Sequence, residues 1–251
     1  MAEQQVYNIA VLAFTAAGVL ILIALFFIPA PYGRHLKKSF GFAVNNRTGW
    51  LLMEAPASIL FIVFLFWGNQ HIGIVTVVFL LIWQAHYLYR SFIYPFRLIP
   101  RPMPLAVAFM GLFFNIMNTY LQGRWFAVIG PEYAASWLRD PRFIIGLAMF
   151  ITGFAINKWA DNVLHRLKRE NPGTYRIPSG GLYNAISSPN YFGEIIEWSG
   201  WAVMTWSVPG AVFAFWTAAN LMPRAWSHHR WYKRTFPDYP KERKALIPGV
   251  W

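Results

Sequence analysis

Long apolar runs alternate with shorter polar stretches along the whole chain. A helix that spans a membrane needs about 20 mostly apolar residues. Runs close to that length lie at 6–30, 50–67, 72–89, 103–121, 143–160, 194–207 and 208–222. The last two are short and separated by Pro209, which leaves the count at six or seven. The pattern predicts an all-α, polytopic integral membrane protein with about seven transmembrane helices.

The composition supports this class. Of the 251 residues, 57% are hydrophobic and only 13% are charged, which is too apolar for a soluble domain of this length. The first run is longer than a signal-peptide core and no basic residue precedes it, so we expect it to remain as a helix of the mature protein. The absence of cysteine excludes disulfides, thiolate-held metals and iron-sulfur clusters.

The distribution of positive charge predicts the orientation. With seven spans and the N-terminus outside, 19 of the 22 Lys and Arg fall in loops on the inner side, and only Arg124, Arg139 and Arg142 lie outside. The positive-inside rule therefore favours an outside N-terminus and a cytosolic C-terminus. The membrane would be the endoplasmic reticulum in a eukaryote or the inner membrane in a bacterium. A cytosolic face this basic also suits a polyanionic cofactor such as a dinucleotide, whereas the loop distribution argues against nucleic acid.

The chain shows no internal repeat and is read as a single membrane domain over 1–251. Its longest polar segments, 158–190 and 223–251, both lie in the C-terminal part, so catalytic and binding residues are expected to concentrate there. Turn-forming residues are dense in 170–190, which predicts a structured connector leading into a helix that begins near Asn190.

The stretch "NYFGEIIEWSGW" carries two of the ten acidic residues into an apolar run. One helical stripe would contain Asn190, Glu194, Glu197, Trp198 and Trp201. Because ionisable groups in a membrane cost several kcal/mol unless paired or wetted, this stripe should face a protein interior or a cavity. The alternative is that the acids simply begin the helix, where its dipole favours them and interfacial water solvates them.

A second acid, Glu54, lies in "LLMEAPASILFIVFLFW" with Pro56 nearby and no basic residue within one turn. A lone carboxyl there should favour its protonated form and could donate a hydrogen bond. Further along, Tyr87, Arg90 and Tyr94 share one helical face. An interfacial aromatic belt explains Tyr94 well and Tyr87 less well.

Familiar cofactor and catalytic motifs are missing. No two of the six His have the i, i+4 spacing of a helical zinc motif, so no metal is expected. The sequence contains neither a G-x-G-x-x-G fingerprint nor a P-loop, and it has no G-x-S-x-G elbow. What remains is a membrane cavity with acids, a tyrosine and a basic cytosolic mouth.

Several stretches of the chain together carry a family resemblance. The longest are "YRIPSGGLYNAISSPNYFGEIIEWSGWAVMTWSVP" and "FAFWTAANLMPRAWSHHRWYKRTFPDYPKERKALIP". Before them the chain carries "PYGRH", "MEAP", "HYLYRSFIYPF" and "INKWADNVLHRL". These motifs resemble those of the steroid 5α-reductase family in the same order, and the resemblance covers nearly the whole chain.

The resemblance implies a seven-helix membrane enzyme that uses NADPH to reduce the C4–C5 double bond of 3-oxo-Δ4 steroids. The family's Glu and Tyr that contact the 3-oxo group match Glu54 and Tyr87, the expected catalytic pair. The four helices of 1–122 would form much of the substrate cavity, and 143–251 would form the cofactor site.

The same resemblance implies a set of cofactor-binding residues. These are Arg34, Arg101, Asn157, Asp161, Lys168, Tyr175, Arg176, Asn190, Glu194, Trp198, Arg224, His228 and Tyr232. NADPH is preferred to NADH because the excess of positive charge suits an added 2′-phosphate. The chain departs from the family pattern at Met53, Leu98 and Lys168, and a lysine lacks the bidentate fork of arginine.

Other functions remain open from sequence. The substrate could be a polyprenoid, an enoyl thioester or another lipophilic enone in the membrane. An isoprenylcysteine-type membrane methyltransferase, which is distantly similar in its C-terminal part, would bind S-adenosylmethionine instead. A receptor or transporter without catalysis is the third alternative. The expected partners are the lipophilic substrate and membrane lipid, with neither nucleic acid nor a metal.

Overall fold

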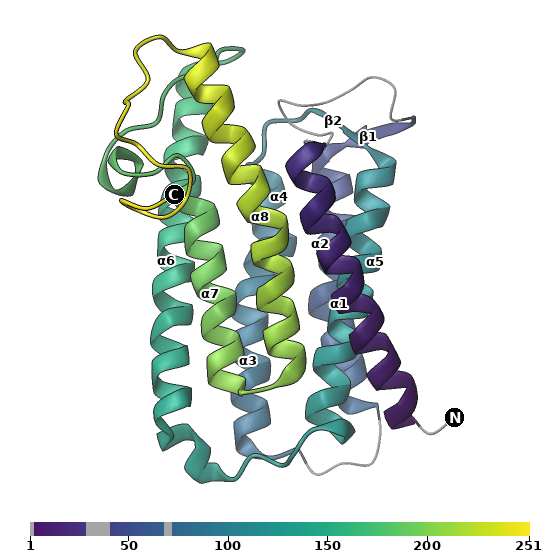
Figure 1. The fold of residues 1–251 in the computed structure, drawn as a ribbon. Helices are drawn as coiled ribbons and strands as arrows, with labels where there is room; N and C mark the ends of the chain where they lie inside the picture. The colour runs from purple at the N-terminus through teal and green to yellow at the C-terminus, as the bar shows by residue number, and fades with distance from the viewer. Residues whose placement is uncertain (1–2, 29–40, 68–71) are drawn as a thin grey trace.

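The computed structural model describes residues 3–28, 41–67 and 72–251, and in this part of the chain it is a bundle of long helices (Figure 1). The long helices are α1 (Glu3–Phe27), α2 (Asn46–Phe66), α3 (Ile74–Leu88), α5 (Leu105–Arg124), α6 (Pro141–Glu170), α7 (Pro189–Thr205) and α8 (Val208–Thr235). Shorter helical segments are η2 (Tyr89–Ile93), α4 (Tyr94–Arg97), η3 (Trp125–Ile129), η4 (Ala135–Arg139) and η5 (Gly181–Asn184). One small antiparallel pair, β1 (Ala43–Asn45) with β2 (Pro102–Pro104), joins the loops before α2 and α5.

The all-α prediction is confirmed, and the protein is an integral membrane protein. Four helical stretches in the described chain are long and apolar enough to cross a membrane: Glu3–Phe27, Asn46–Phe66, Leu105–Ile129 and Pro141–Glu170. The helices α3 and α7 have 15 and 17 residues, and α8 is long but has a polar C-terminal part.

Two helices continue well beyond the apolar runs that predict them. The helix α6 extends to Glu170 rather than ending near 160, and α8 extends to Thr235 rather than 222. Hydrophobicity marks only the part of a helix that contacts lipid or core. In α6 no helix-breaking residue follows until Asn171 and Pro172, whereas α8 continues through Pro223 and ends before Pro237. These polar extensions form the outer wall of the site described below.

Helices α6 and α7 pack closely through four glycines. A Cβ on Gly153 would collide with the backbone nitrogen of Glu197, and one on Gly193 would lie 2.6 Å from the backbone nitrogen of Asn157. Gly146 and Gly200 make the same kind of contact one heptad away. Small residues let membrane helices approach closely. This approach brings polar residues of α6 within hydrogen-bonding reach of α7.

An aromatic core joins α2, α3, α5 and α7. The Trp83 ring stacks on Phe61 at 4.6 Å, and its Nε1 donates to the Ala57 carbonyl at 2.9 Å. The Trp201 Nε1 donates to Oε1 of Gln122 at 3.0 Å, so both buried indoles have a partner for their N–H group. Tyr87 lies at the edge of this core, with its ring 4.7 Å from that of Trp83.

Candidate active site

Glu54 is placed on α2 by contacts from two other elements. Its Oε1 lies 3.7 Å from Nε of Arg90, and its Oε2 lies 3.5 Å from Nδ2 of Asn115, which also donates to the Met53 carbonyl at 2.7 Å. The expectation that Glu54 is a lone carboxyl is therefore wrong. Its cation comes from 36 positions later in the chain, beyond a search of neighbouring turns.

Arg90 reaches this position because the helix widens after α3. Pro95 lacks the N–H group that would donate to the Ser91 carbonyl in an α-helix. The preceding segment η2 is π-helical, and in it the Tyr94 N–H donates to the carbonyl of Tyr89, five residues back. The Arg90 guanidinium lies over the Trp50 ring at 4.7 Å and the Tyr94 ring at 4.8 Å. Two cation–π contacts thus hold it between α2 and α4.

Arg90 also joins the two halves of the site. Its Nη2 lies 4.0 Å from Oε1 of Glu194 on α7, while its Nε faces Glu54 on α2. The Arg90 side chain is only 14% exposed, so both ion pairs lie largely out of solvent. A single cation is therefore shared between two carboxyl groups from different ends of the sequence.

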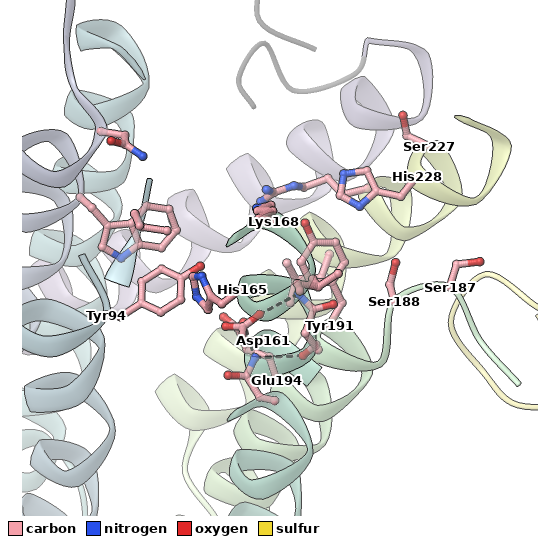
Figure 2. A pocket seen from close by; sticks show the side chains of 18 of the residues that line it. Tyr94, Asp161, His165, Lys168, Ser187, Ser188, Tyr191, Glu194, Ser227 and His228 are labelled. Atoms are coloured by element: carbon pink, nitrogen blue, oxygen red, sulfur yellow. Dashed lines mark hydrogen bonds between the residues drawn. The ribbon is translucent and has the colours of Figure 1, made fainter. Parts of the chain in front are cut away.

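A chain of hydrogen bonds continues from Glu194 into α6. The Asn157 Nδ2 donates to Oε2 of Glu194 at 3.2 Å and to the Asn190 carbonyl at 3.0 Å. The Asn190 Nδ2 in turn donates to Oδ1 of Asp161 at 3.1 Å. Figure 2 shows Asp161 and Glu194 together on one side of the cavity with Tyr191 beside them. All four polar residues of this chain were expected at the cofactor site.

Tyr87 is buried, with 3% of its surface exposed. Its ring packs against His86 at 4.9 Å and Trp198 at 5.8 Å. No direct hydrogen bond joins Tyr87 to Glu54 among the contacts of the described residues. Neither of these two expected catalytic residues is among the described residues that line the cavity.

The two acids of the α7 stripe have different surroundings. Glu194 lines the cavity, whereas Glu197 is fully buried behind it and its Oε1 lies 2.6 Å from Nδ1 of His86. The other Glu197 oxygen, Oε2, has no hydrogen-bond partner in the described part of the protein. The nearby buried Nζ of Lys158 has none there either, and it lies over the Tyr89 ring at 4.0 Å. The α7 stripe thus faces the cavity at Glu194 and the protein interior at Glu197.

The cavity opens between α6, α7, α8 and the segment 90–103. Ten of the thirteen expected cofactor residues line it: Arg101, Asn157, Asp161, Lys168, Tyr175, Asn190, Glu194, Arg224, His228 and Tyr232. The lining also includes residues that no sequence motif singled out for the cofactor: Asn46, Trp50, Arg90, Tyr94, Ser188 and Tyr191. They come from the start of α2, from η2 and α4, and from the beginning of α7 with the residue before it, which only the fold brings together.

Three expected cofactor residues are not in this lining. Arg34 lies outside the described residues. Arg176 lies on the exposed connector, where its Nε donates to Oδ1 of Asn171 at 3.2 Å. Trp198 is 2% exposed within the aromatic core, with its ring 4.3 Å from Phe213 and 4.6 Å from His86. From this position the Trp198 ring packs against the ring of Tyr87.

The outer part of the cavity is basic and aromatic, unlike its amide-rich floor. Arg101, Lys168 and Arg224 bring positive charge to it. The Arg224 guanidinium lies 5.4 Å over the Tyr191 ring, and the His228 ring is 5.5 Å from the same ring. In Figure 2, Lys168 and His228 lie toward the outer side of this space. Within the described ranges, no three His, Asp or Glu side chains are grouped in a way that could hold a metal ion.

The departures at Met53 and Leu98 have structural consequences. The Met53 side chain packs against Gly111 on α5, where any added Cβ would collide with it. The Leu98 carbonyl accepts hydrogen bonds from Nε and Nη2 of Arg47 at 3.1 and 2.9 Å, and Leu98 lines the cavity. An apolar side chain thus takes the place of an amide at this point of the wall.

Comparisons with known proteins agree with this geometry. The sequence profile described as 3-oxo-5-alpha-steroid 4-dehydrogenase matches residues 101–251. The chain belongs to this family. It is 42% identical to "Steroid 5-alpha-reductase DET2" of Gossypium hirsutum, over 99% of each chain. It is 39% identical to "3-oxo-5-alpha-steroid 4-dehydrogenase 1" of Homo sapiens, over 86% of this chain and 85% of the relative. The predicted family, and with it an oxidoreductase, is confirmed.

Proposed function

We propose that this protein reduces the C4–C5 double bond of a 3-oxo-Δ4 steroid with NADPH, giving the 5α-3-oxosteroid within the membrane. The observation that carries the proposal is Arg90, whose guanidinium joins Glu54 on α2 to Glu194 on α7. Glu54 is thereby linked to the cofactor-type lining through Arg90, and in this proposal the carbonyl-binding pair and the cofactor share one site. The family membership and the named activity of its relatives support the same substrate class.

The proposed topology has seven spans, with α3, α7 and the first part of α8 crossing alongside the four longest apolar stretches. The N-terminus would lie outside and the C-terminus in the cytosol. The support is that Arg101, Lys168 and Arg224 line one cavity at the polar end of the bundle, opposite the N-terminus in Figure 1. The cofactor would then approach from the cytosol. In this topology 1–122 supplies Glu54 and Tyr87, and 143–251 supplies most of the cofactor lining.

Tyr87 and Glu54 would act on the substrate carbonyl. Addition of a hydride at C5 moves negative charge onto the 3-oxo oxygen, and a donor aimed at that oxygen lowers the barrier by about 3 kcal/mol. The Tyr87 hydroxyl is one such donor. Arg90 faces both Glu54 and Glu194, so a proton on Glu54 leaves Arg90 and Glu194 as a balanced ion pair. The protonated Glu54 is then the second donor, and Asn115 holds it in place.

The residues of the cavity suit a phosphorylated dinucleotide. Such a cofactor needs cations for its phosphates, hydrogen-bonding groups for its amide and ribose, and flat surfaces for its rings. Asn157, Asn190 and Glu194 would hold the nicotinamide end, and Asp161 a ribose hydroxyl. Arg101, Lys168 and Arg224 would hold the phosphates. When bound, NADPH supplies the hydride, and the aromatic core behind Tyr87 keeps water from the reacting region.

Tryptophan fluorescence of the purified protein tests the cofactor class. Addition of NADPH should quench the emission with saturation, because the Trp50 indole lines the cavity. S-adenosylmethionine should leave the emission unchanged. Quenching by S-adenosylmethionine with no response to NADPH would point to a methyltransferase. No response to either would leave a receptor or transporter as the better reading and would contradict the proposal.

Replacing Lys168 with glutamine should raise the KM for NADPH by about tenfold, which is the loss of one exposed charge-assisted hydrogen bond. The KM for NADH should change little, because NADH lacks the 2′-phosphate. Arg166→Gln is the matched control, since this exposed residue lies on the same helix outside the cavity lining. Equal changes in the KM for NADPH and for NADH would show that Lys168 does not bind the 2′-phosphate.

A further inference from the structure

A second groove lies on the C-terminal side of α8 and shares no lining residue with the active-site cavity. Six of its lining residues are Lys or Arg: Arg230, Lys233, Arg234, Lys241, Arg243 and Lys244. The described residues that line it include no Asp or Glu, and the nearest acids in sequence, Asp238 and Glu242, are exposed. We call this surface the basic groove. Its six Lys and Arg side chains carry more positive charge than one exposed turn of a helix would carry.

The basic groove is built by the tail folding back on the connector before α7. The Lys244 N–H donates to the Ala185 carbonyl at 2.9 Å, and the Ser187 N–H donates to the Lys244 carbonyl at 2.8 Å. At the end of the chain, the Trp251 ring stacks on Trp226 of α8 at 6.0 Å and 13°. Backbone pairing and ring stacking therefore hold the two walls of the groove at a defined separation.

One cation of the groove lacks a partner for part of its guanidinium. Arg243 is 4% exposed, and its Nη1 donates to the Pro178 carbonyl at 3.1 Å, but its buried Nε has no hydrogen-bond partner among the described residues. Tyr239, whose ring lies 5.0 Å below this guanidinium, supplies no negative charge, because burial raises the pKa of its phenol. A buried N–H without an acceptor is costly, so an acceptor from outside the chain would be stabilising here.

Exposed apolar side chains lie beside these cations. Val250 is 74% exposed, and Ile247 and Trp226 are each more than one third exposed. In Figure 1 the tail, coloured yellow, turns back from the end of α8 toward the rest of the bundle. A groove with cations on one side and exposed apolar groups with a tryptophan on the other matches the interfacial region of a bilayer.

We propose that the basic groove binds the headgroup phosphate of an anionic phospholipid, with the apolar rim against its acyl chains. The Nε of Arg243 and the exposed cations of α8 donate to the phosphate oxygens, in the way basic pockets at the ends of membrane helices bind acidic headgroups. The mixed lining favours a lipid over a soluble anion, because a soluble anion would gain nothing from Val250 and Trp226.

Lipid retention by the full-length protein tests this assignment. The protein is reconstituted with phosphatidylcholine and phosphatidylglycerol, returned to detergent, and the lipids that stay bound are counted by native mass spectrometry. The double variant Arg230→Gln, Arg234→Gln should lower the preference for phosphatidylglycerol by roughly 25-fold, at about fivefold for each basic residue near an anionic headgroup. The control double variant Arg166→Gln, Arg169→Gln removes two exposed arginines of α6 and should stay within about twofold of the parent.

Three outcomes would overturn the proposal. One is an equal loss in both double variants, which would mean a general charge effect. Another is no preference for phosphatidylglycerol in the parent protein. The third is displacement of bound phosphatidylglycerol by millimolar glycerol phosphate, which would indicate a site for soluble anions. Should the first double variant fail to fold, Lys241→Gln on the exposed tail replaces it, with an expected loss of about fivefold; an unchanged preference in that variant also overturns the proposal.

Discussion

Replacing Tyr87 with phenylalanine should lower kcat for reduction of a 3-oxo-Δ4 steroid by about 100- to 1,000-fold, the loss expected when one oxyanion donor is removed. The substitution removes only the hydroxyl. The ring stays packed against Trp83 and Trp198, so the fold and the affinity for NADPH should be unchanged. Single-turnover absorbance of NADPH at saturating steroid measures the rate directly.

Tyr89→Phe is the matched control for this variant. Tyr89 lies two residues further along the chain, where its hydroxyl accepts a hydrogen bond from Arg97 at the surface of the bundle. Its loss should leave kcat within about twofold, as for an exposed substitution away from the site. Full turnover by Tyr87→Phe would mean that another group polarises the carbonyl.

The second large effect is expected for Arg90→Leu, which should impair both stability and catalysis. Removing one partner of a largely buried ion pair costs about 3–5 kcal/mol, because the remaining charge is left without compensation. Here Glu194 would lose the cation of its ion pair, and the protonated Glu54 would lose a neighbour that orients it. We expect a clearly lower melting temperature and a loss of kcat/KM of at least about 100-fold, since each 1.4 kcal/mol of lost transition-state stabilisation is tenfold.

Two further variants separate position from charge. Arg97→Leu removes a nearby exposed arginine that donates to Asn162 at 2.7 Å, and it should behave like the parent protein. Arg90→Lys keeps the charge but loses the planar guanidinium that lies between Trp50 and Tyr94, so an intermediate loss is expected. If Arg90→Leu melts and turns over like the parent, the shared ion pair does not organise the site.

Hydrophobic runs predicted the helices well because lipid or core contact requires a continuous apolar face. They could not predict where α6 and α8 end, because these helices continue in polar sequence as far as Glu170 and Thr235. The π-helical segment η2 was also missed. Its cause, Pro95, is visible in the sequence, but a proline can equally kink or end a helix.

The candidate site was predicted mainly through family motifs, whereas its connections depend on the fold. Spacing placed Glu194 and Glu197 on one stripe, yet residues three apart differ in direction by roughly 60° and in height by about 4.5 Å. That difference is enough to put Glu194 in the cavity and Glu197 against His86. The role of Arg90 was missed because its partners are far away in sequence. An arginine inside an apolar stretch, which by default suggests a functional site, was the available signal.

The central claim is that one continuous site holds the substrate carbonyl and the reducing cofactor together. The most direct test incubates the purified protein in bilayers with a 3-oxo-Δ4 steroid and NADPH carrying deuterium at the transferable position of the nicotinamide. We predict a 5α-3-oxosteroid with one deuterium at C5, identified by mass spectrometry and NMR. Deuterium at C3 in an alcohol, or no saturated product under conditions in which NADPH quenches the tryptophan fluorescence, would contradict the claim.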